Sequence, residues 1–281
     1  MTCSWRCALR LESVNRVIHL RTQEEIDVIA RGGKIIANLL AEIAPRVVPG
    51  ASTADLDIFC DEYILSHDGA VPVFKGLYGF PGSVCTSVNE EVVHGIPSPS
   101  RILASGDIVS VDVGVRLAEW CSDSAWTFLV GEVDDAVHGL LEITEKALGV
   151  AIEAAKPGNH VGDIGAAVIT TVEGKSYAIV RDLVGHGVGR EVHEEPQIPN
   201  IGRPGHGPLL REGMVLAIEP MLSAGSPEIR TLDDGWTVIT ADRALSAHFE
   251  HTVAVTAQGP KVLTTLESSF HTVSTTTTTT A

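Results

Sequence analysis

Two stretches of the chain carry the same pattern of turn and helix residues, and their separation is the feature that most restricts the fold. Pro49-Gly50 is followed by Asp55-Leu56, and Pro157-Gly158 by Asp163-Ile164, so each part of the pattern recurs after 108 residues. We infer an internal duplication of a unit made of helix, turn, helix and sheet. Two halves that share one sheet would form a single α+β domain, not two separable ones.

The helices of both copies are predicted from the spacing of apolar residues. Thr22 and Glu25 form a capping-box pair, and apolar residues then recur every three or four positions until Pro45. A second helix is expected to start at residue 52 or 53. In the second copy the same helical spacing runs over residues 140–155, and another helix is expected after the second Pro-Gly turn.

Residues 108–130 alternate branched and polar side chains, which predicts two strands joined by a hairpin turn. If the turn centres on Leu117 and Ala118, Asp112 lies directly opposite Asp123 and both carboxylates point to the same face. Two like charges this close repel each other unless a cation binds between them. The alternative is that both acids lie on the solvated face of an edge strand.

Two glutamates extend this set of acids. Adding the 108-residue repeat to Asp112 gives position 220, one residue from Glu219. The duplication therefore predicts that Asp112 and Glu219 occupy related places in the two halves and face each other across one site. Glu219 and Glu250 both occur inside or at the end of apolar strands, where an acid is costly unless it is paired or bound to a metal.

The Gly-rich segment 185–196 contains two histidines, His186 and His193. Imidazole can ligate a metal or transfer a proton near neutral pH, and glycine permits close approach of the backbone. Alone, the segment is equally compatible with a turn that carries hydrogen-bonded histidines. Together, four acids and one histidine form an oxygen-rich set suited to a pair of divalent ions such as manganese, iron or cobalt. Two such ions can hold a bridging hydroxide and polarise a carbonyl, which is a hydrolytic arrangement.

Charge and composition restrict the partners. The net charge of −16 repels phosphate backbones and anionic lipids, so nucleic acid is not expected as the main ligand. Five irregularly spaced cysteines indicate reduced thiols and a cytoplasmic protein. No apolar run reaches the length of a signal-peptide core or a membrane span. We expect an N-terminal extension at residues 1–16, one domain at residues 17–267 and a disordered Thr-rich tail at residues 268–281.

Two continuous motifs occur in the chain: Phe80-Pro81-Gly82-Ser83-Val84-Cys85-Thr86-Ser87-Val88-Asn89-Glu90 and His94-Gly95-Ile96-Pro97. The site residues also form three spaced pairs, in which the aspartates are 11 residues apart, the histidines seven and the glutamates 31. With these motifs the chain resembles the type I methionine aminopeptidases, which form subfamily A of peptidase family M24, from about Val17 to about Thr264. The short interval between the glutamates looks like type I. The lack of an N-terminal zinc-binding extension makes the resemblance closest to the bacterial, single-domain form.

The resemblance implies the pita-bread fold, a pseudo-twofold α/β domain whose duplicated halves surround a central antiparallel sheet. It also implies a metallo-aminopeptidase that removes the initiator methionine from nascent proteins when the second residue is small. Two divalent ions (cobalt, manganese, iron(II) or zinc) would assist the hydrolysis, and Asp123 and Glu250 would bridge them. The full set of implied metal ligands is Asp112, Asp123, His186, Glu219 and Glu250.

The resemblance implies partners and further roles. The partners would be the N-termini of nascent polypeptides, met at the ribosome by a cytoplasmic monomer that binds no nucleic acid directly and no membrane. His94 would position the substrate and assist proton transfer, and His193 would contact the scissile carbonyl. Glu219 would also accept a proton from the attacking water.

The substrate methionine is expected in an apolar pocket whose walls are Phe80, Cys85 and Trp236, because thioether contacts with aromatic edges are favourable. The alternative for these three residues is plain core packing. The chain departs from the family pattern at residues 119–122, where a Gly-rich turn ending in histidine and glycine is more usual, and at Ala217, where a hydroxyl residue is common. Neither departure removes an implied ligand.

Two other functions remain open. A proline-directed exopeptidase of the same fold would use a similar ligand set, but it normally carries a separate N-terminal domain, for which about 20 residues leave no room. A non-catalytic peptide-binding module would typically have lost ligands, whereas all five are present here.

Overall fold

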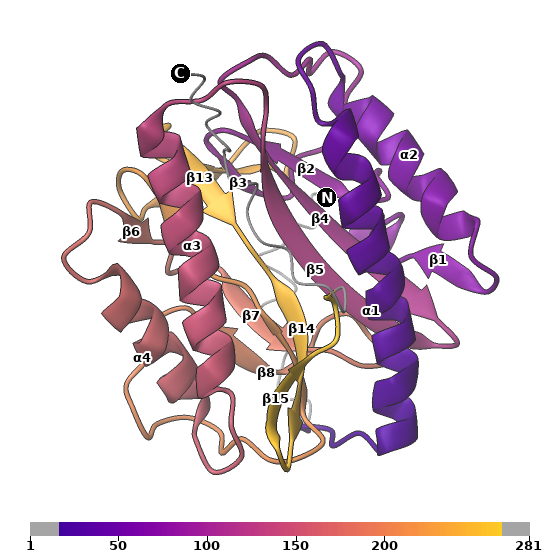
Figure 1. Cartoon of the computed structure of the whole chain (residues 1–281), viewed down its shortest axis with the longest axis vertical. Helices are drawn as coiled ribbons and strands as arrows, with labels where there is room; N and C mark the ends of the chain where they lie inside the picture. Colours follow the sequence, from indigo (N-terminus) through magenta and orange to yellow (C-terminus); the bar gives the residue numbers. More distant parts are fainter. Residues whose placement is uncertain (1–16, 266–281) are drawn as a thin grey trace, which may run out of the picture.

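The computed structural model describes residues 17–265 (Figure 1). The extension predicted for residues 1–16 and the tail predicted for residues 268–281 lie outside the described residues. Within 17–265, no helix is both long enough and apolar enough to cross a membrane.

Four α-helices form in the described part of the chain, and the first two begin as the sequence predicts. Thr22 and Glu25 make the capping box of α1, and Ser52 and Asp55 make an equivalent one for α2. A single 3₁₀ turn at Ala44–Arg46 follows α1, in agreement with the expected end near Pro45. The helices are α1 (Gln23–Ile43), α2 (Thr53–Leu65), α3 (Asp135–Ala154) and α4 (Val161–Val172).

Every strand pair in residues 17–265 is antiparallel. One sheet has the order β1-β4-β2 with β5 on β4, and another the order β15-β14-β9-β7-β8; two smaller ones are β13-β10-β6 and β11-β12-β3. The strands are β1 (Ala70–Pro72), β2 (Cys85–Val88), β3 (Glu91–Val93), β4 (Ile108–Leu117), β5 (Trp120–Leu129), β6 (Ala178–Ile179), β7 (Val184–Gly187), β8 (Glu194–Pro199), β9 (Val215–Ile218), β10 (Met221–Ser223), β11 (Ile229–Thr231), β12 (Val238–Thr240), β13 (Ser246–His248), β14 (His251–Thr256) and β15 (Gly259–Val262).

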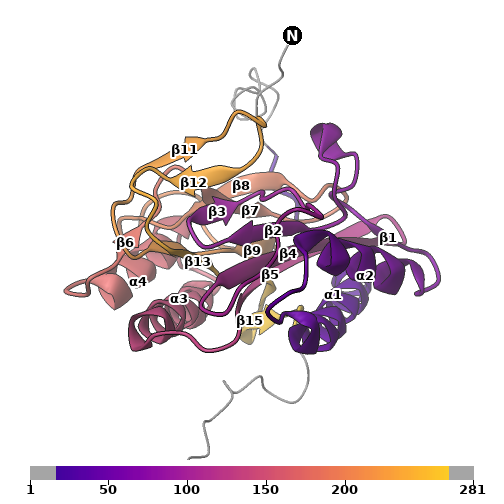
Figure 2. The same ribbon diagram turned by 90° about the horizontal axis from the view of Figure 1, so that it is seen from above.

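The helices cover one side of the strands. Figure 2 shows α1 and α2 on the lower side of β4 and β5, and α3 and α4 on the lower side of β7 and β8, with β15 at the level of the helices. Each helix pair encloses its own apolar core. Val109, Val111, Val113 and Val115 of β4 pack against α1 and α2, whereas Leu216 and Ile218 of β9 pack against α3 and α4. The burial of these two apolar faces drives the layered arrangement.

The two halves repeat the same backbone contacts, which confirms the duplication predicted from the sequence. Gly50 donates its N–H to Leu103 O at 2.8 Å, and Gly158 donates its N–H to Leu210 O at 3.0 Å. Both glycines have positive φ, +93° and +90°, a conformation that side chains disfavour. The N-cap residue that follows each turn makes an isolated β-bridge, from Ser52 to Ile102 and from His160 to Leu209.

The hairpin of β4 and β5 forms as predicted, but its register is shifted. Asp112 pairs with Ala125, and Asp123 pairs with Gly114, so the predicted direct opposition of the two aspartates was wrong. The turn lies one residue further along, at Ala118 and Glu119, with φ of +48° and +70°. Positive φ at both central residues is the geometry of a type I′ turn, for which neither residue is a usual choice. The aspartates remain diagonal neighbours on one face.

The predicted strands around the two glutamates are interrupted at the acids themselves. β9 ends at Ile218 and β10 starts at Met221, so Glu219 lies in the break between them. In the same way, Glu250 lies between β13 and β14. A residue outside the regular ladder can aim its side chain away from the alternation of the strand, as it does at a β-bulge.

Candidate active site

All five predicted ligands converge on one place between the halves of the fold. Asp112 and Asp123 come from β4 and β5, His186 from β7, and Glu219 and Glu250 from the two strand breaks. Three overlapping groups offer ligand atoms that lie within 4.8 Å of one another: Asp123, His186 and His193; His186, Glu219 and Glu250; and Asp112, Asp123 and Glu250. Because the groups share members, they surround a continuous space.

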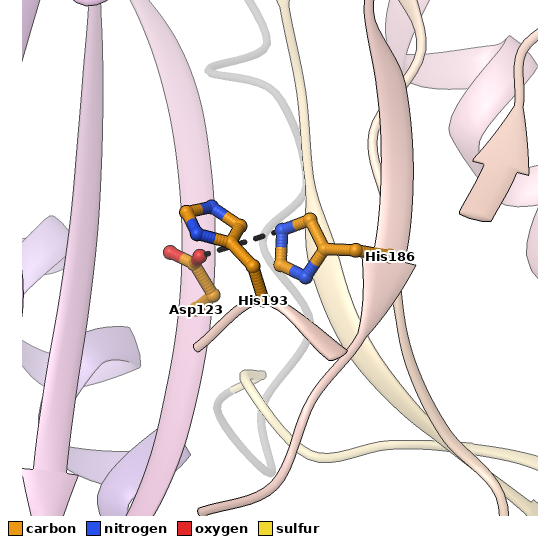
Figure 3. A group of neighbouring side chains, drawn as sticks. All are labelled: Asp123, His186 and His193. Atoms are coloured by element: carbon orange, nitrogen blue, oxygen red, sulfur yellow. Dashed lines mark ion pairs between the residues drawn. The ribbon is translucent and has the colours of Figure 1, made fainter. Parts of the chain in front are cut away.

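His186 lies between acids that the two halves contribute. Its Nε2 is 3.4 Å from Glu219 Oε1 and 3.9 Å from Asp123 Oδ2. Figure 3 shows Asp123 on its strand facing His186, with the His193 ring beside both. The rings of His186 and His193 meet edge to face at 4.5 Å between centroids. Each group can thus present a nitrogen or an oxygen to the same central space.

Burial and mutual repulsion disfavour the charged forms of these acids. Burial raises the pKa of Asp112 to about 7. Burial and the neighbouring acids raise the pKa values of Asp123, Glu219 and Glu250 well above their usual range. Three buried carboxylate oxygens have no hydrogen-bond partner within the described residues: Asp112 Oδ1, Asp123 Oδ1 and Glu250 Oε1. Buried carboxylates without donors are costly unless a metal binds them, so the residues present fit a divalent metal site.

Hydroxyl groups lock together the strands that carry Asp123 and Glu250. Thr252 Oγ1 accepts from the Asp123 N–H at 3.0 Å and donates to Asp123 O at 2.7 Å. Ser124 Oγ donates to Glu250 O at 2.6 Å, and the Glu250 N–H donates to Ala125 O at 2.9 Å. These bonds join β5 to β14 where no regular ladder runs, and they fix the two acids side by side.

The two remaining site histidines are neutral. Burial lowers the pKa of His94 to about 4 and holds the pKa of His193 well below its usual value. His94 has a positive φ of +59°, an uncommon conformation for a residue with a side chain and one that often marks a functional position. Neutral imidazoles can donate one hydrogen bond and accept another, as proton transfer requires.

An apolar cavity adjoins these histidines. Phe80 and Trp236, which meet edge to face at 5.2 Å, line it together with Cys85, so the three predicted pocket residues do lie together. Phe74 also lines the cavity and was missed from the sequence. A Cβ on Gly114 would lie 3.0 Å from the Phe74 ring, so the glycine paired with Asp123 provides the space that this ring occupies. The complete lining is Phe74, Leu77, Phe80, Cys85, His94, His193 and Trp236.

The unusual residues 119–122 support the segment that carries His193. The Trp120 ring contacts two guanidinium groups, with its centroid 5.0 Å from Cζ of Arg21 and 4.9 Å from Cζ of Arg190. Arg21 forms an ion pair with Glu194, next to His193, and Glu194 Oε1 accepts from the Arg190 N–H at 2.8 Å. The Cys121 N–H donates to Gly189 O at 2.7 Å. The first departure from the family pattern therefore builds a stacked contact and does not disrupt the site.

His248 is the other residue that the sequence did not single out. Its side chain is 2% exposed, and its Nε2 lies 3.6 Å from Glu219 Oε2. Burial lowers the pKa of His248 to about 3. The available signal was its place two residues before Glu250 in a strand, which puts both side chains on one face if the strand continues.

Carboxylates that repel one another inside a protein are tolerated when divalent ions bind between them, and here the adjoining cavity is lined mainly by apolar side chains. This fold and site define a metal-dependent hydrolase. The chain belongs to metallopeptidase family M24, whose sequence profile matches residues 27–257. As a member of a metallopeptidase family, it binds a divalent metal.

Individual relatives are similar over nearly the whole chain. A methionine aminopeptidase of Clostridium perfringens is 50% identical over 248 residues, which cover 88% of this chain and 99% of the relative. The crystal structure of methionine aminopeptidase from Thermotoga maritima superposes with a TM-score of 0.87 at 43% identity, covering 89% of this chain and 100% of that one. These matches confirm the pita-bread fold and the predicted resemblance.

A prolidase of the same fold matches less well. The prolidase from Pyrococcus furiosus superposes with a TM-score of 0.71 at 25% identity. The match covers 90% of this chain but only 66% of the prolidase chain. The proline-directed alternative is therefore not favoured.

Proposed function

We propose that the chain acts as a methionyl aminopeptidase, which hydrolyses the bond after an N-terminal methionine when the second residue is small. The observation that carries this function is that His193 belongs to a group of candidate metal ligands and also lines the cavity formed by Phe80, Cys85 and Trp236, so the cavity adjoins the acids. A methionine side chain in that cavity would bring its own peptide bond to the acids. Proteins named methionine aminopeptidase, at 42–50% identity, support the assignment.

We further propose two metal ions, held by Asp112, Asp123, His186, Glu219 and Glu250. Asp123, His186 and Glu250 each belong to two of the overlapping ligand groups, which supports one continuous site for both ions. The oxygen-rich set suits manganese, cobalt, iron(II) or zinc. When bound, divalent ions lower the pKa of water and polarise a carbonyl, which is the chemistry that peptide hydrolysis needs.

The protein's own groups would then bind the substrate and move the protons. Glu219 accepts the proton of the attacking water at its carboxylate, and that proton passes to the nitrogen of the departing amine. His193 donates to the scissile carbonyl oxygen as negative charge develops there. His94 orients the scissile amide and assists the transfer to the leaving nitrogen. The aromatic walls exclude water from the side-chain pocket and contact the thioether.

The expected partners follow from this reaction. The substrates are the N-termini of nascent polypeptides, and the ribosome is where the enzyme would meet them. We propose that the enzyme works as a cytoplasmic monomer whose domain spans residues 17–267.

The test compares two tetrapeptides on metal-stripped protein reloaded with cobalt or manganese. Free methionine should be released from Met-Gly-Met-Met, only with metal, and Gly-Pro-Met-Met should remain intact. Cleavage of the second peptide alone would instead establish a proline-directed enzyme. If neither peptide were cleaved while metal was bound, the chain would be a peptide-binding module.

A further inference from the structure

His248 reaches the acid cluster from the interior of the molecule. It is the last residue of β13, where it pairs with Met221 of β10, and it is 2% exposed. Within the described residues its Nε2 is a buried atom with no hydrogen-bond partner. Thr127 Oγ1 donates to the His248 backbone O and accepts from its N–H, so the backbone is fixed while the ring nitrogen is left for another group.

The carboxylate of Glu219 lies between two imidazoles. Its Oε1 is 3.4 Å from His186 Nε2, and its Oε2 is 3.6 Å from His248 Nε2. A turn of the carboxylate that shortens the second distance by about 0.6 Å would bring it into hydrogen-bond range. His248 is absent from all three groups of candidate ligands in the described residues, whereas Glu219 belongs to one of them. Of the two histidines that flank Glu219, His186 is therefore a candidate metal ligand and His248 is not.

We propose that His248 is a positioning residue whose Nε2–H donates to Glu219 Oε2 and so directs Glu219 Oε1 toward the metal. The inference rests on the proposed metal site. A carboxylate free to rotate would present its oxygens to the ions in several orientations, and groups that orient metal ligands typically change metal affinity 10- to 100-fold when removed. The donor also satisfies a ring nitrogen that would otherwise remain buried without a partner, which is costly.

The experiment compares three substitutions at position 248 with one control. His248→Gln places an amide nitrogen near the position of Nε2, whereas His248→Asn places it near Nδ1, and His248→Phe keeps the ring without a donor. Met221→Leu alters the buried cross-strand neighbour without removing any polar group. Each metal-free protein is titrated with Mn²⁺ by calorimetry, and the absorption spectrum of its Co²⁺ complex reports the geometry of the ligands.

We expect His248→Phe and His248→Asn to bind Mn²⁺ about 10- to 100-fold more weakly and to change the Co²⁺ spectrum. His248→Gln and Met221→Leu should stay close to wild type in both readouts, and KM for the peptide should change little in all four. If His248→Phe should not fold, the Gln and Asn pair decides alone.

Wild-type affinity and an unchanged spectrum in both the Asn and Phe variants would reduce His248 to core packing and overturn the inference. Equal losses in the Gln and Asn variants would also overturn it, because a donor at the Nε2 position would then not suffice. Failure of the wild-type protein to bind either ion would overturn the proposed function itself, and the inference with it.

Discussion

Asp112 is a half-buried acid whose ionisation makes the stability of the metal-free protein depend on pH. Its Oδ1 has no hydrogen-bond partner in the described structure, and burial raises the pKa of its carboxyl to about 7. A carboxyl with a raised folded-state pKa contributes stability below its unfolded pKa of about 3.9 and loses that contribution as the pH rises through about 7. Above pH 7 the metal-free protein therefore carries a repelled charge that bound metal relieves.

Asp112→Asn cannot ionise at this position, so it should be more stable than wild type when no metal is bound. In EDTA at pH 8, the variant should melt at least about 2–4 °C above wild type, the shift expected for 1 kcal/mol in a chain of this size. The difference should shrink as the pH falls toward 5, and the variant should lose much of the metal-induced rise in Tm. Calorimetry at both pH values checks this, and a pH-independent difference would contradict it.

His94 allows the chemistry to be separated from metal binding. His94→Asn should lower kcat by about 10²- to 10⁴-fold, the usual contribution of a general acid or base. Mn²⁺ affinity should stay near wild type because His94 belongs to none of the candidate ligand groups in residues 17–265. Asparagine is chosen because it tolerates the positive φ of +59° at this position better than alanine does. Loss of metal binding in the variant would make His94 a ligand.

The site residues differ in how far the sequence could predict them. An acid in an apolar strand violates the usual pattern, so Asp112, Glu219 and Glu250 were predictable one by one. Phe74 and His248 violate nothing, because a buried ring in or near a strand is ordinary. Their part in the site depends on contacts between segments far apart in the chain, such as β1 with β4 and β10 with β13.

The β4–β5 hairpin has a turn whose type could not be predicted from its sequence. A type I′ turn favours Asn-Gly, whereas Ala118 and Glu119 occupy it here, and the predicted register was wrong for that reason. The strands themselves were predictable because alternating valines face one core. The breaks at Glu219 and Glu250 were not predicted, because apolar side chains resume within three residues after each acid.

Correcting the turn should stabilise the protein. Ala118→Asn should raise the free energy of unfolding by about 0.5–1 kcal/mol, because asparagine adopts positive φ more readily than alanine. Ala104→Asn, at an exposed position whose φ is negative, should give no gain. Chemical denaturation of both variants checks the difference, and equal effects at the two positions would contradict the assignment to backbone conformation.

The same hairpin should influence catalysis through Trp120. Trp120→Ala would remove the ring that contacts Arg21 and Arg190 and loosen residues 189–194, which carry His193. We expect kcat to fall by about tenfold or more, since small misplacements of a catalytic group are costly. Hydrogen exchange should increase at residues 189–194. Trp120→Phe keeps an aromatic face and should recover most of the rate; the same loss in both variants would argue against stacking as the cause.

Metal bound between the two halves of the molecule should stabilise the whole fold. Asp112 and Asp123 come from one half, and His186, Glu219 and Glu250 from the other, so ions at the proposed site would contact both. Mn²⁺ at 100 times its Kd should stabilise the fold by about 2.7 kcal/mol. That corresponds to a rise in Tm of roughly 5–10 °C.

Calorimetric scans over a range of Mn²⁺ concentrations test this. Glu250→Gln should show a smaller rise, whereas the exposed Glu212→Gln should keep the full one. A Tm that does not depend on Mn²⁺ in the wild-type protein would contradict a site built from both halves.

The repeat of 108 residues also has a consequence for how the site assembles. If the halves were separate chains, the five ligands would come together only as often as the chains met, and a dilute solution would contain mostly incomplete sites. Joining them in one polypeptide turns that encounter into an intramolecular step with a high effective concentration. The fraction of molecules with a complete ligand set is then independent of how much of the protein is present, and each half is free to keep ligands that the other lacks.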